Sequence, residues 1–198
     1  MLESTNRDAQ KWNKRFTESR TSWLRAQPRQ LLIDFAYLLP SSGLALDAAA
    51  GVATHGLFMA QRGLHVIALD ISEVGLRLAK QQADAEGVWL ETAVTDLSQP
   101  WLPANIFDVI VNFRFLQRET FPVYRTALKP GGLLIFETFV RTEQTSHDAA
   151  YYLEPGELHA AFSDWNIVHY AEINGRSRRD NHQKCAAQLV AYKPISGS

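Results

Sequence analysis

The chain has 198 residues, 46% of them hydrophobic, which is enough apolar surface for one globular domain with a single sizeable core. Lys and Arg together number 20, and Asp and Glu together number 21, so the net charge of -1 provides no general attraction to nucleic acid or to an anionic membrane. The single cysteine, Cys185, excludes an internal disulfide and a zinc site built on a cysteine cluster. We therefore expect no metal site, no nucleic acid partner, and a small molecule as the binding partner.

The amino-terminal residues are polar, and no later apolar run reaches the roughly 18 residues that are needed to cross a bilayer. Neither secretion nor membrane insertion is expected. We expect a cytoplasmic protein, present as a monomer or a homodimer.

Helical patterns occupy the first forty residues. Residues 3–26 are predicted to form one polar helix that carries Trp12, Phe16 and Trp23 near one face. A second helix with a dense apolar stripe follows Pro28 and ends at the sequence PSSG. The aromatic face of the first helix is expected to pack on the core, to cover a ligand as a lid, or to do both.

From Leu44 onward, short apolar runs alternate with helical stretches, a pattern that indicates βαβ units and a parallel sheet. The run FDVIVNF is apolar and rich in β-branched residues, so we expect a strand that is buried on both faces and central in the sheet. Strands are predicted at 44–48, 65–70, 88–94, 107–113, 133–139, 165–173 and 184–192, and helices at 53–62, 73–86, 119–128 and 154–162. The sequence KPGG is expected to break the helix that precedes the fifth strand.

The most informative stretch is the turn after the first of these strands, which reads Asp47-Ala48-Ala49-Ala50-Gly51-Val52-Ala53 and leads directly into a helix. Small residues at such a turn allow a ligand to approach the backbone closely, and the start of the helix offers unpaired N–H groups. This arrangement suits the carboxylate of an amino-acid-like ligand. A tight packing of helix on sheet would also require small residues here.

Two further aspartates follow the next two strands. Asp70 lies 23 residues after Asp47, and a carboxylate at that strand end can accept both hydroxyls of an unmodified ribose. Ser72 is the better helix cap, which leaves the Asp70 side chain available. Asp96 is expected at the neighbouring strand end, within reach of an adenine amino group. Either aspartate could instead be a helix cap or a turn former.

These residues resemble the class I S-adenosylmethionine (SAM)-dependent methyltransferases, in which an acidic residue opens a D-x-G-x-G-x-G turn and a second acidic residue ends the next strand. Only the middle glycine is kept here, as Gly51, while Ala49 and Ala53 stand where glycines are usual. The resemblance continues through ALDIS, VTDL, FDVIVNF and LKPGGLLIFETF, so it covers roughly residues 44–139 in the right order. It implies an α/β fold: a Rossmann-like, seven-stranded, mostly parallel sheet with helices on both faces and the last strand antiparallel.

The resemblance also implies that the cofactor is SAM and that the product is S-adenosylhomocysteine. It assigns the SAM amino group to Asp47, the methionine portion to Gly51, the ribose to Asp70, the adenine to Asp96 and a place beside the reactive methyl to Asn112. The implied cofactor-binding set also includes Ala49, Ala53, Ile71 and Leu97.

More narrowly, three segments resemble the small tellurite-resistance (TehB-like) and thiopurine-type branch: WNKRF, GVATHGLFMAQRGLHVIALDIS and YYLEPGELHAAFSDWNIVHY. We expect a single methyltransferase domain over residues 1–198. Its parts are N-terminal helices or a lid at 1–40, a cofactor-binding core at 44–139, and a substrate loop with the C-terminal strands at 140–198. The loop at 140–153 is the expected determinant of specificity.

Methyl transfer is an in-line displacement at a sulfonium carbon, so the protein mainly has to position an electron-rich atom and exclude water. The expected acceptor is a small molecule such as a thiol or a chalcogen oxyanion. A thiolate needs no base, whereas an oxygen or nitrogen acceptor could use one. The candidate bases are His55, Glu137, His147, Tyr151 and Tyr152.

Two arginines lie where an acceptor would approach. Arg114 and Arg118 could bind an anionic substrate, or they could be solvated surface residues.

Two other functions remain open from the sequence. A nicotinamide-dependent oxidoreductase also places a glycine-rich turn before a helix, but its spacing would require glycines at the positions of Ala49 and Thr54. A non-enzymatic SAM-binding or interaction module would share the cofactor residues and lack a pocket beside the methyl group.

Overall fold

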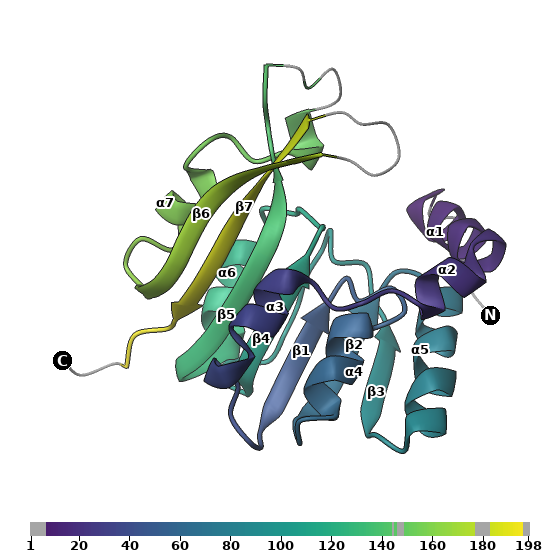
Figure 1. Cartoon of the computed structure of the whole chain (residues 1–198). Coiled ribbons are helices and arrows are strands. Elements are labelled where there is room, and N and C mark those ends of the chain that lie inside the picture. The colour runs from purple at the N-terminus through teal and green to yellow at the C-terminus, as the bar shows by residue number, and fades with distance from the viewer. Residues whose placement is uncertain (1–6, 144, 146–148, 177–182, 196–198) are drawn as a thin grey trace.

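The computed structural model describes residues 7–143, 145, 149–176 and 183–195 (Figure 1). Its centre is a seven-stranded sheet in the order β3-β2-β1-β4-β5-β7-β6. The strands are β1 (Leu44–Ala48), β2 (His65–Asp70), β3 (Leu90–Val94), β4 (Phe107–Phe113), β5 (Leu128–Val140), β6 (Asn166–Arg176) and β7 (Gln183–Tyr192).

The first five strands are parallel, and β7 runs antiparallel to both of its neighbours, β5 and β6. The predicted fold class is therefore confirmed. Strand β4 lies in the middle of the sheet, and its residues Val109, Ile110 and Val111 are fully buried. The continuous apolar run indicated this central position because both faces of such a strand are covered.

The order of the strands places a switch point at β1. The chain builds β2 and β3 on one side of β1 and then crosses over to place β4 on its other side. The loops that follow β1 and β4 therefore diverge, and in open α/β sheets this divergence creates a crevice at the carboxyl ends of the strands.

Helices cover both faces of the sheet. In Figure 1, α3 (Gln30–Asp34) and α4 (Thr54–Ala60) lie in front of the sheet and α6 (Thr120–Ala127) lies behind it. One buried cluster joins α3, α4 and α5 (Glu73–Glu86) to the sheet. A second joins α6 and α7 (Glu157–Ala161) to the opposite face.

The N-terminal segment forms two helices, α1 (Arg7–Glu18) and α2 (Arg20–Leu24), so the prediction of one helix over 3–26 was wrong. In one continuous helix, Phe16 and Trp23 would be separated by about 10.5 Å along the axis. The break at Ser19 brings their ring centroids to 5.1 Å in an edge-on contact. The aromatic contact thus accompanies the interruption of the helix.

Several boundaries also differ from the predictions. The helix after Pro28 is α3 followed by a short 3-10 helix η1 (Ala36–Leu38), α7 is shorter than 154–162, and β3 begins at Leu90 rather than at 88. The sequence KPGG lies within β5 and does not precede it. Its glycines exchange backbone hydrogen bonds with Lys193, and Leu128 pairs with Phe107, so tertiary pairing extends the strand through a sequence that resembles a turn.

None of the helices in the described residues is both long enough and apolar enough to span a membrane.

Candidate functional site

The turn between β1 and α4 keeps the backbone of a glycine-rich loop although two of its glycine positions hold alanine. Ala49, Gly51 and Ala53 have φ values of 55°, 58° and 51°, all in the left-handed region. This conformation costs a residue with a Cβ about 1 kcal/mol or more. The Ala53 methyl is fully buried in the α4 face of the core, and this burial offsets part of the cost.

Glycine is required sterically at position 51. A Cβ built there would lie 2.8 Å from Cζ of Phe16, a buried ring on α1 that is 3% exposed. The ring therefore packs directly on the turn. This contact explains why Gly51 is the one position of the three that keeps the glycine.

Asp47 lies on β1 immediately before this turn and is only 1% exposed. Its Oδ2 accepts a hydrogen bond from the Gly56 backbone N–H at 2.7 Å, whereas its Oδ1 is buried and has no partner among the described residues. Burial and, to a smaller extent, the nearby charge of Asp70 raise the pKa of Asp47 to about 7, against the opposing effect of the Gly56 hydrogen bond. A buried carboxylate oxygen without a partner is unfavourable, and a cationic donor would satisfy it.

Asp70 ends β2 and is also buried. Its Oδ2 accepts the Gly51 N–H at 2.8 Å and its Oδ1 accepts the Ser72 N–H at 2.7 Å. The side chain is therefore engaged by the backbone, which the sequence did not predict, although each oxygen keeps a second lone pair for a ligand. Ser72 does cap α5, as expected, with its Oγ accepting the Gly75 N–H.

The crevice is electrostatically suited to a cation. Burial raises the pKa of Asp70 as it does that of Asp47, and the hydrogen bonds from Ser72 and Gly51 only partly oppose this effect. Neither aspartate forms an ion pair with another described residue. A positively charged ligand would lower the energetic cost of these two buried carboxylates.

Helix α1 packs on the turn after β1 and on the start of α5. Asn13 Oδ1 accepts hydrogen bonds from Ser72 Oγ at 2.7 Å and from the Val74 N–H at 3.2 Å, which fixes α1 to the start of α5. Phe16 packs on Gly51, and Trp23 packs on Phe16. The Trp23 indole Nε1 is buried without a partner in the described part of the chain. The sequence indicated an aromatic face on this helix, but neither the role of Asn13 nor the docking position.

The other residues assigned to the cofactor differ in their exposure to solvent. Asp96 is exposed and its Oδ1 accepts the Ser98 N–H at 2.9 Å, while Leu97 is buried in the core and Ile71 is half-buried. Asn112 is fully buried: its Oδ1 accepts the Tyr124 hydroxyl and its Nδ2 donates to the Phe115 carbonyl. The Asn112 side chain thus supports the loop after β4.

His55 is the second residue of α4, and its ring stacks on Phe113 at the end of β4, with centroids 4.2 Å apart. Its Nε2 is buried and has no partner among the residues that the structure describes. Burial, and then the positive charge of Arg29, lower the pKa of His55 to about 3. The imidazole is therefore neutral at physiological pH.

Arg114 directly follows β4 and belongs to a cluster that the sequence did not reveal as a unit. Its Nε lies 3.1 Å from Oε1 of the buried Glu137, and the Nε of Arg29 lies 3.3 Å from the same oxygen. The other Glu137 oxygen accepts from Gln188 Nε2 at 2.8 Å. Glu137 is thus an ion-pair partner here. Arg29 precedes α3 in the chain, and no local signal connects it to a strand more than a hundred residues later.

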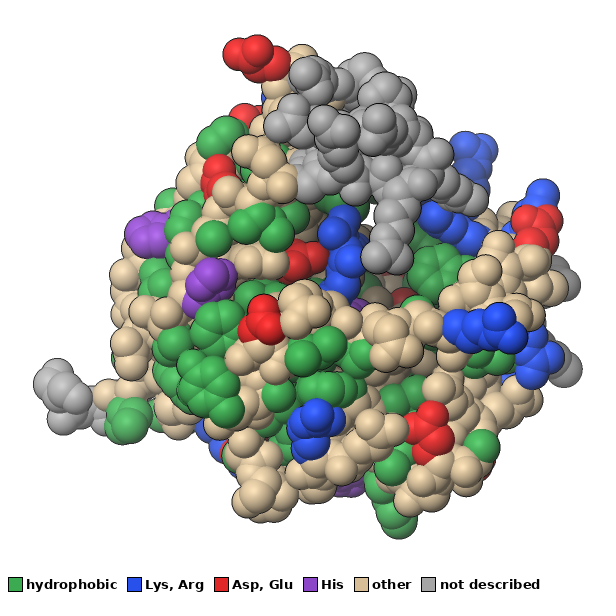
Figure 2. All heavy atoms as spheres, viewed as in Figure 1, with side chains coloured by type: hydrophobic (Ala, Val, Ile, Leu, Met, Phe, Trp, Pro, Cys, Tyr) green, Lys and Arg blue, Asp and Glu red, His purple; other side chains and the backbone are tan. Residues whose placement is uncertain are grey.

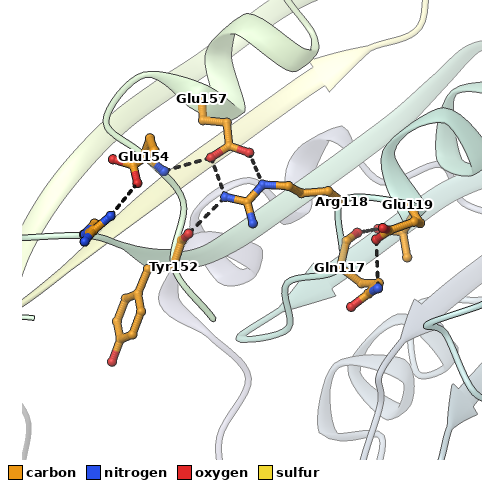
Figure 3. A network of polar contacts seen from close by, with 8 residues as sticks. Gln117, Arg118, Glu119, Tyr152, Glu154 and Glu157 are labelled. Atoms are coloured by element: carbon orange, nitrogen blue, oxygen red, sulfur yellow. Dashed lines mark hydrogen bonds and ion pairs between the residues drawn. The ribbon is translucent and has the colours of Figure 1, made fainter. Parts of the chain in front are cut away.

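Arg118 lies apart from this cluster. Figure 3 shows it pointing toward Glu157 and the Tyr152 carbonyl, and its guanidinium forms two hydrogen bonds with the Glu157 carboxylate. It ties the loop after β4 to the start of α7. The hydrogen bond with Arg118 lowers the pKa of Glu157. Of the remaining candidate bases, Tyr151 is exposed and His147 lies outside the described residues.

No group of three or more potential metal ligands occurs within the described ranges.

Comparison with known proteins gives a consistent result. Residues 45–132 match the family model of the methyltransferase domain. A ubiquinone biosynthesis O-methyltransferase from Cereibacter sphaeroides is 27% identical over an alignment of 150 residues, and the match covers 64% of this chain and 61% of that protein. The chain thus spans about three fifths of the length of the curated relatives it matches.

Solved structures show the same fold at low sequence identity. TehB from Haemophilus influenzae superimposes with a TM-score of 0.77 at 18% identity, covering 92% of this chain and 67% of that one. Phosphoethanolamine N-methyltransferase 2 from Haemonchus contortus, solved in complex with S-adenosyl-L-methionine, gives 0.66 at 16% identity and covers 83% and 52%. The [4+2]-cyclase SpnF gives 0.71 at 18% identity, covering 87% and 84%.

Proposed function

We propose that this chain binds SAM beside Asp47, Gly51 and Asp70 and transfers the methyl group to a small-molecule acceptor. The match of residues 45–132 to the methyltransferase domain model and the fold shared with TehB support this proposal. The observation that carries the proposal is the buried Asp47 Oδ1, which lacks a partner among the described residues and lies beside the left-handed turn. A cationic amino-acid portion of a ligand would satisfy it.

The residues at the crevice fit this cofactor. SAM is cationic at its sulfonium and at its ammonium, and both Asp47 and Asp70 are buried carboxyls with a raised pKa. Asp47 would hold the ammonium, and Asp70 would accept the ribose hydroxyls with its remaining lone pairs. The H. contortus enzyme, which has this fold, was solved with SAM bound, and this supports the assignment.

When bound, SAM supplies an electrophilic methyl group whose bond to sulfur breaks as a lone pair of the acceptor bonds to the carbon, leaving S-adenosylhomocysteine. The protein has to hold the two partners in line and exclude water. Phe16 and Asn13 on α1 would close the cofactor side, since they already cover Gly51 and bond to Ser72. The acceptor would enter from the side of β4 and β5, as a thiol, a chalcogen oxyanion or a similar small molecule.

Calorimetric titration tests the proposal. SAM and S-adenosylhomocysteine are titrated into the wild-type protein, into Asp70→Ala and into Asp84→Ala, an exposed aspartate on α5 that pairs with Lys80. Hydrogen bonds to a charged group contribute roughly 1.5–3 kcal/mol, so we expect about a tenfold to hundredfold loss of affinity in Asp70→Ala and none in the control. Thermal melting checks that each variant is folded.

A wild-type protein that binds neither ligand at pH 7.5 would exclude the proposed function. Where binding is found, production of S-adenosylhomocysteine with a panel of thiols and oxyanions separates an enzyme from a module that only binds SAM.

A further inference from the structure

The cluster of Arg29, Arg114 and Glu137 carries one more positive than negative charge. Both arginines direct Nε to the same carboxylate oxygen, at 3.3 Å and 3.1 Å, and the second oxygen is already engaged by Gln188. Glu137 is 4% exposed, whereas the side chains of Arg29 and Arg114 are 35% and 36% exposed. A buried acid thus anchors two guanidinium groups that remain accessible from solvent.

The terminal Nη groups of these arginines form no hydrogen bond with any described residue; their contacts with Glu137 run through Nε. Guanidinium groups commonly bind carboxylates through two parallel N–H groups, and this mode is still available here. Burial and the charge of Arg29 both lower the pKa of Arg114, so the two cations repel each other across the cluster. A bound anion would relieve this repulsion.

Arg114 is held firmly in its position. Its guanidinium carbon lies 4.2 Å from the centre of the Phe139 ring, which fixes the side chain from the other side. Its backbone has φ 60°, a strained conformation for a residue with a side chain. Strain of this kind concentrates at functional sites, where the surrounding structure maintains it.

Aromatic rings lie on the segments next to these arginines. Phe113 ends β4 and stacks with the neutral His55 ring, and Phe139 lies under Arg114. Strand β4 is the neighbour of β1, so these residues adjoin the turn at Ala49–Ala53. Figure 2 shows a hollow near the centre of the visible face of the molecule, with basic and acidic side chains beside it.

We propose that the methyl acceptor carries a carboxylate on a small aromatic body, that Arg29 and Arg114 bind the carboxylate, and that Phe113, Phe139 and His55 contact the ring. The role of this site in binding a methyl acceptor rests on the proposed function. The anion-binding step does not depend on SAM and is measured separately from it.

Ligand-observed NMR titration tests the inference, with benzoate as the probe, benzamide as its neutral counterpart and acetate as the carboxylate without a ring. Each is titrated into the protein with and without saturating S-adenosylhomocysteine. Charge-assisted hydrogen bonds are about twice as strong as neutral ones, so we expect benzoate to bind about tenfold more tightly than benzamide. We also expect acetate to bind several-fold more weakly than benzoate, because the ring contacts are lost.

Arg114→Gln and Arg29→Gln should each weaken benzoate binding about tenfold and leave benzamide binding unchanged. Arg77→Gln, which removes an exposed arginine paired with Glu73 on α5, is the matched control and should bind benzoate as the wild type does. Calorimetry with S-adenosylhomocysteine and thermal melting on the same variants detect a merely structural effect, which would lower stability without distinguishing benzoate from benzamide.

Equal affinities for benzoate and benzamide, or unchanged benzoate binding in Arg114→Gln, would overturn the inference, as would the absence of benzoate binding. A protein that binds benzoate in this pattern but not S-adenosylhomocysteine would keep the anion site and refute the proposed methyl transfer. The two failures are therefore distinguishable.

Discussion

Replacing Asp47 by asparagine should stabilise the protein at alkaline pH while impairing cofactor binding. The pKa of Asp47 is raised from 3.8 to about 7 in the folded protein, because burial disfavours its charged form. A carboxyl group with a raised pKa binds its proton more tightly in the folded state, so folding stability falls as pH rises from about 4 to about 7. Above pH 7 the full cost, about 4 kcal/mol, is present.

The variant removes this cost but introduces another. The asparagine oxygen can still accept from the Gly56 N–H, while its amide nitrogen would lie where Oδ1 has no partner among the described residues. An unpaired buried donor costs about 1–3 kcal/mol, so the net gain at pH 8 is about 1–3 kcal/mol. At pH 5 the wild-type cost is only about 1.5–2 kcal/mol, and the gain approaches zero.

Urea denaturation of both proteins at pH 5 and pH 8 measures the effect. The free energy of unfolding of Asp47→Asn relative to the wild type should increase by about 2.5 kcal/mol between the two pH values. Asp84→Asn, an exposed position on α5, should show no such change. A difference between Asp47→Asn and the wild type that is the same at both pH values would refute the reasoning, since Asp47 would then ionise normally in the folded protein.

Three further outcomes are expected. SAM affinity should fall about tenfold per pH unit below pH 7, because Asp47 becomes protonated and must lose its proton when SAM binds. Calorimetry in buffers of different ionisation enthalpy should detect this proton release. A constant affinity from pH 5.5 to 7.5 would contradict the prediction. Gly51→Ala should lower the free energy of unfolding by about 1–2 kcal/mol in urea denaturation, because residue 51 has a φ of 58° and the new Cβ would meet the Phe16 ring. The reverse exchange, Ala49→Gly, should change the free energy of unfolding by less than about 1 kcal/mol. A similar loss in both variants would count against the steric explanation. Arg118→Gln should lower the free energy of unfolding by about 1 kcal/mol or less, because the ion pair of Arg118 with Glu157 is partly exposed. The affinity for S-adenosylhomocysteine should not change. A weakened affinity would place Arg118 in the cofactor site.

The sequence alone was sufficient for the order and the type of most central elements. Apolar runs at 44–48, 65–70 and 107–113 became β1, β2 and β4 within their predicted limits, because period and β-branching are local properties. The small-residue turn and the aspartates that follow the strands were also visible, since the parallel topology brings strand ends to one edge. The turn even keeps its left-handed backbone with alanine at two glycine positions.

Only the tertiary structure decided which of these side chains act together. Asp70 accepts hydrogen bonds from the N–H groups of Gly51 and Ser72, and Asn112 accepts one from the buried Tyr124 hydroxyl. These contacts depend on the direction of the backbone and not on residue type. The pairing of Arg29 and Arg114 on Glu137 joins three segments far apart in the chain. Such contacts arise from the way helices and strands pack, and no pattern within a short window of sequence encodes them.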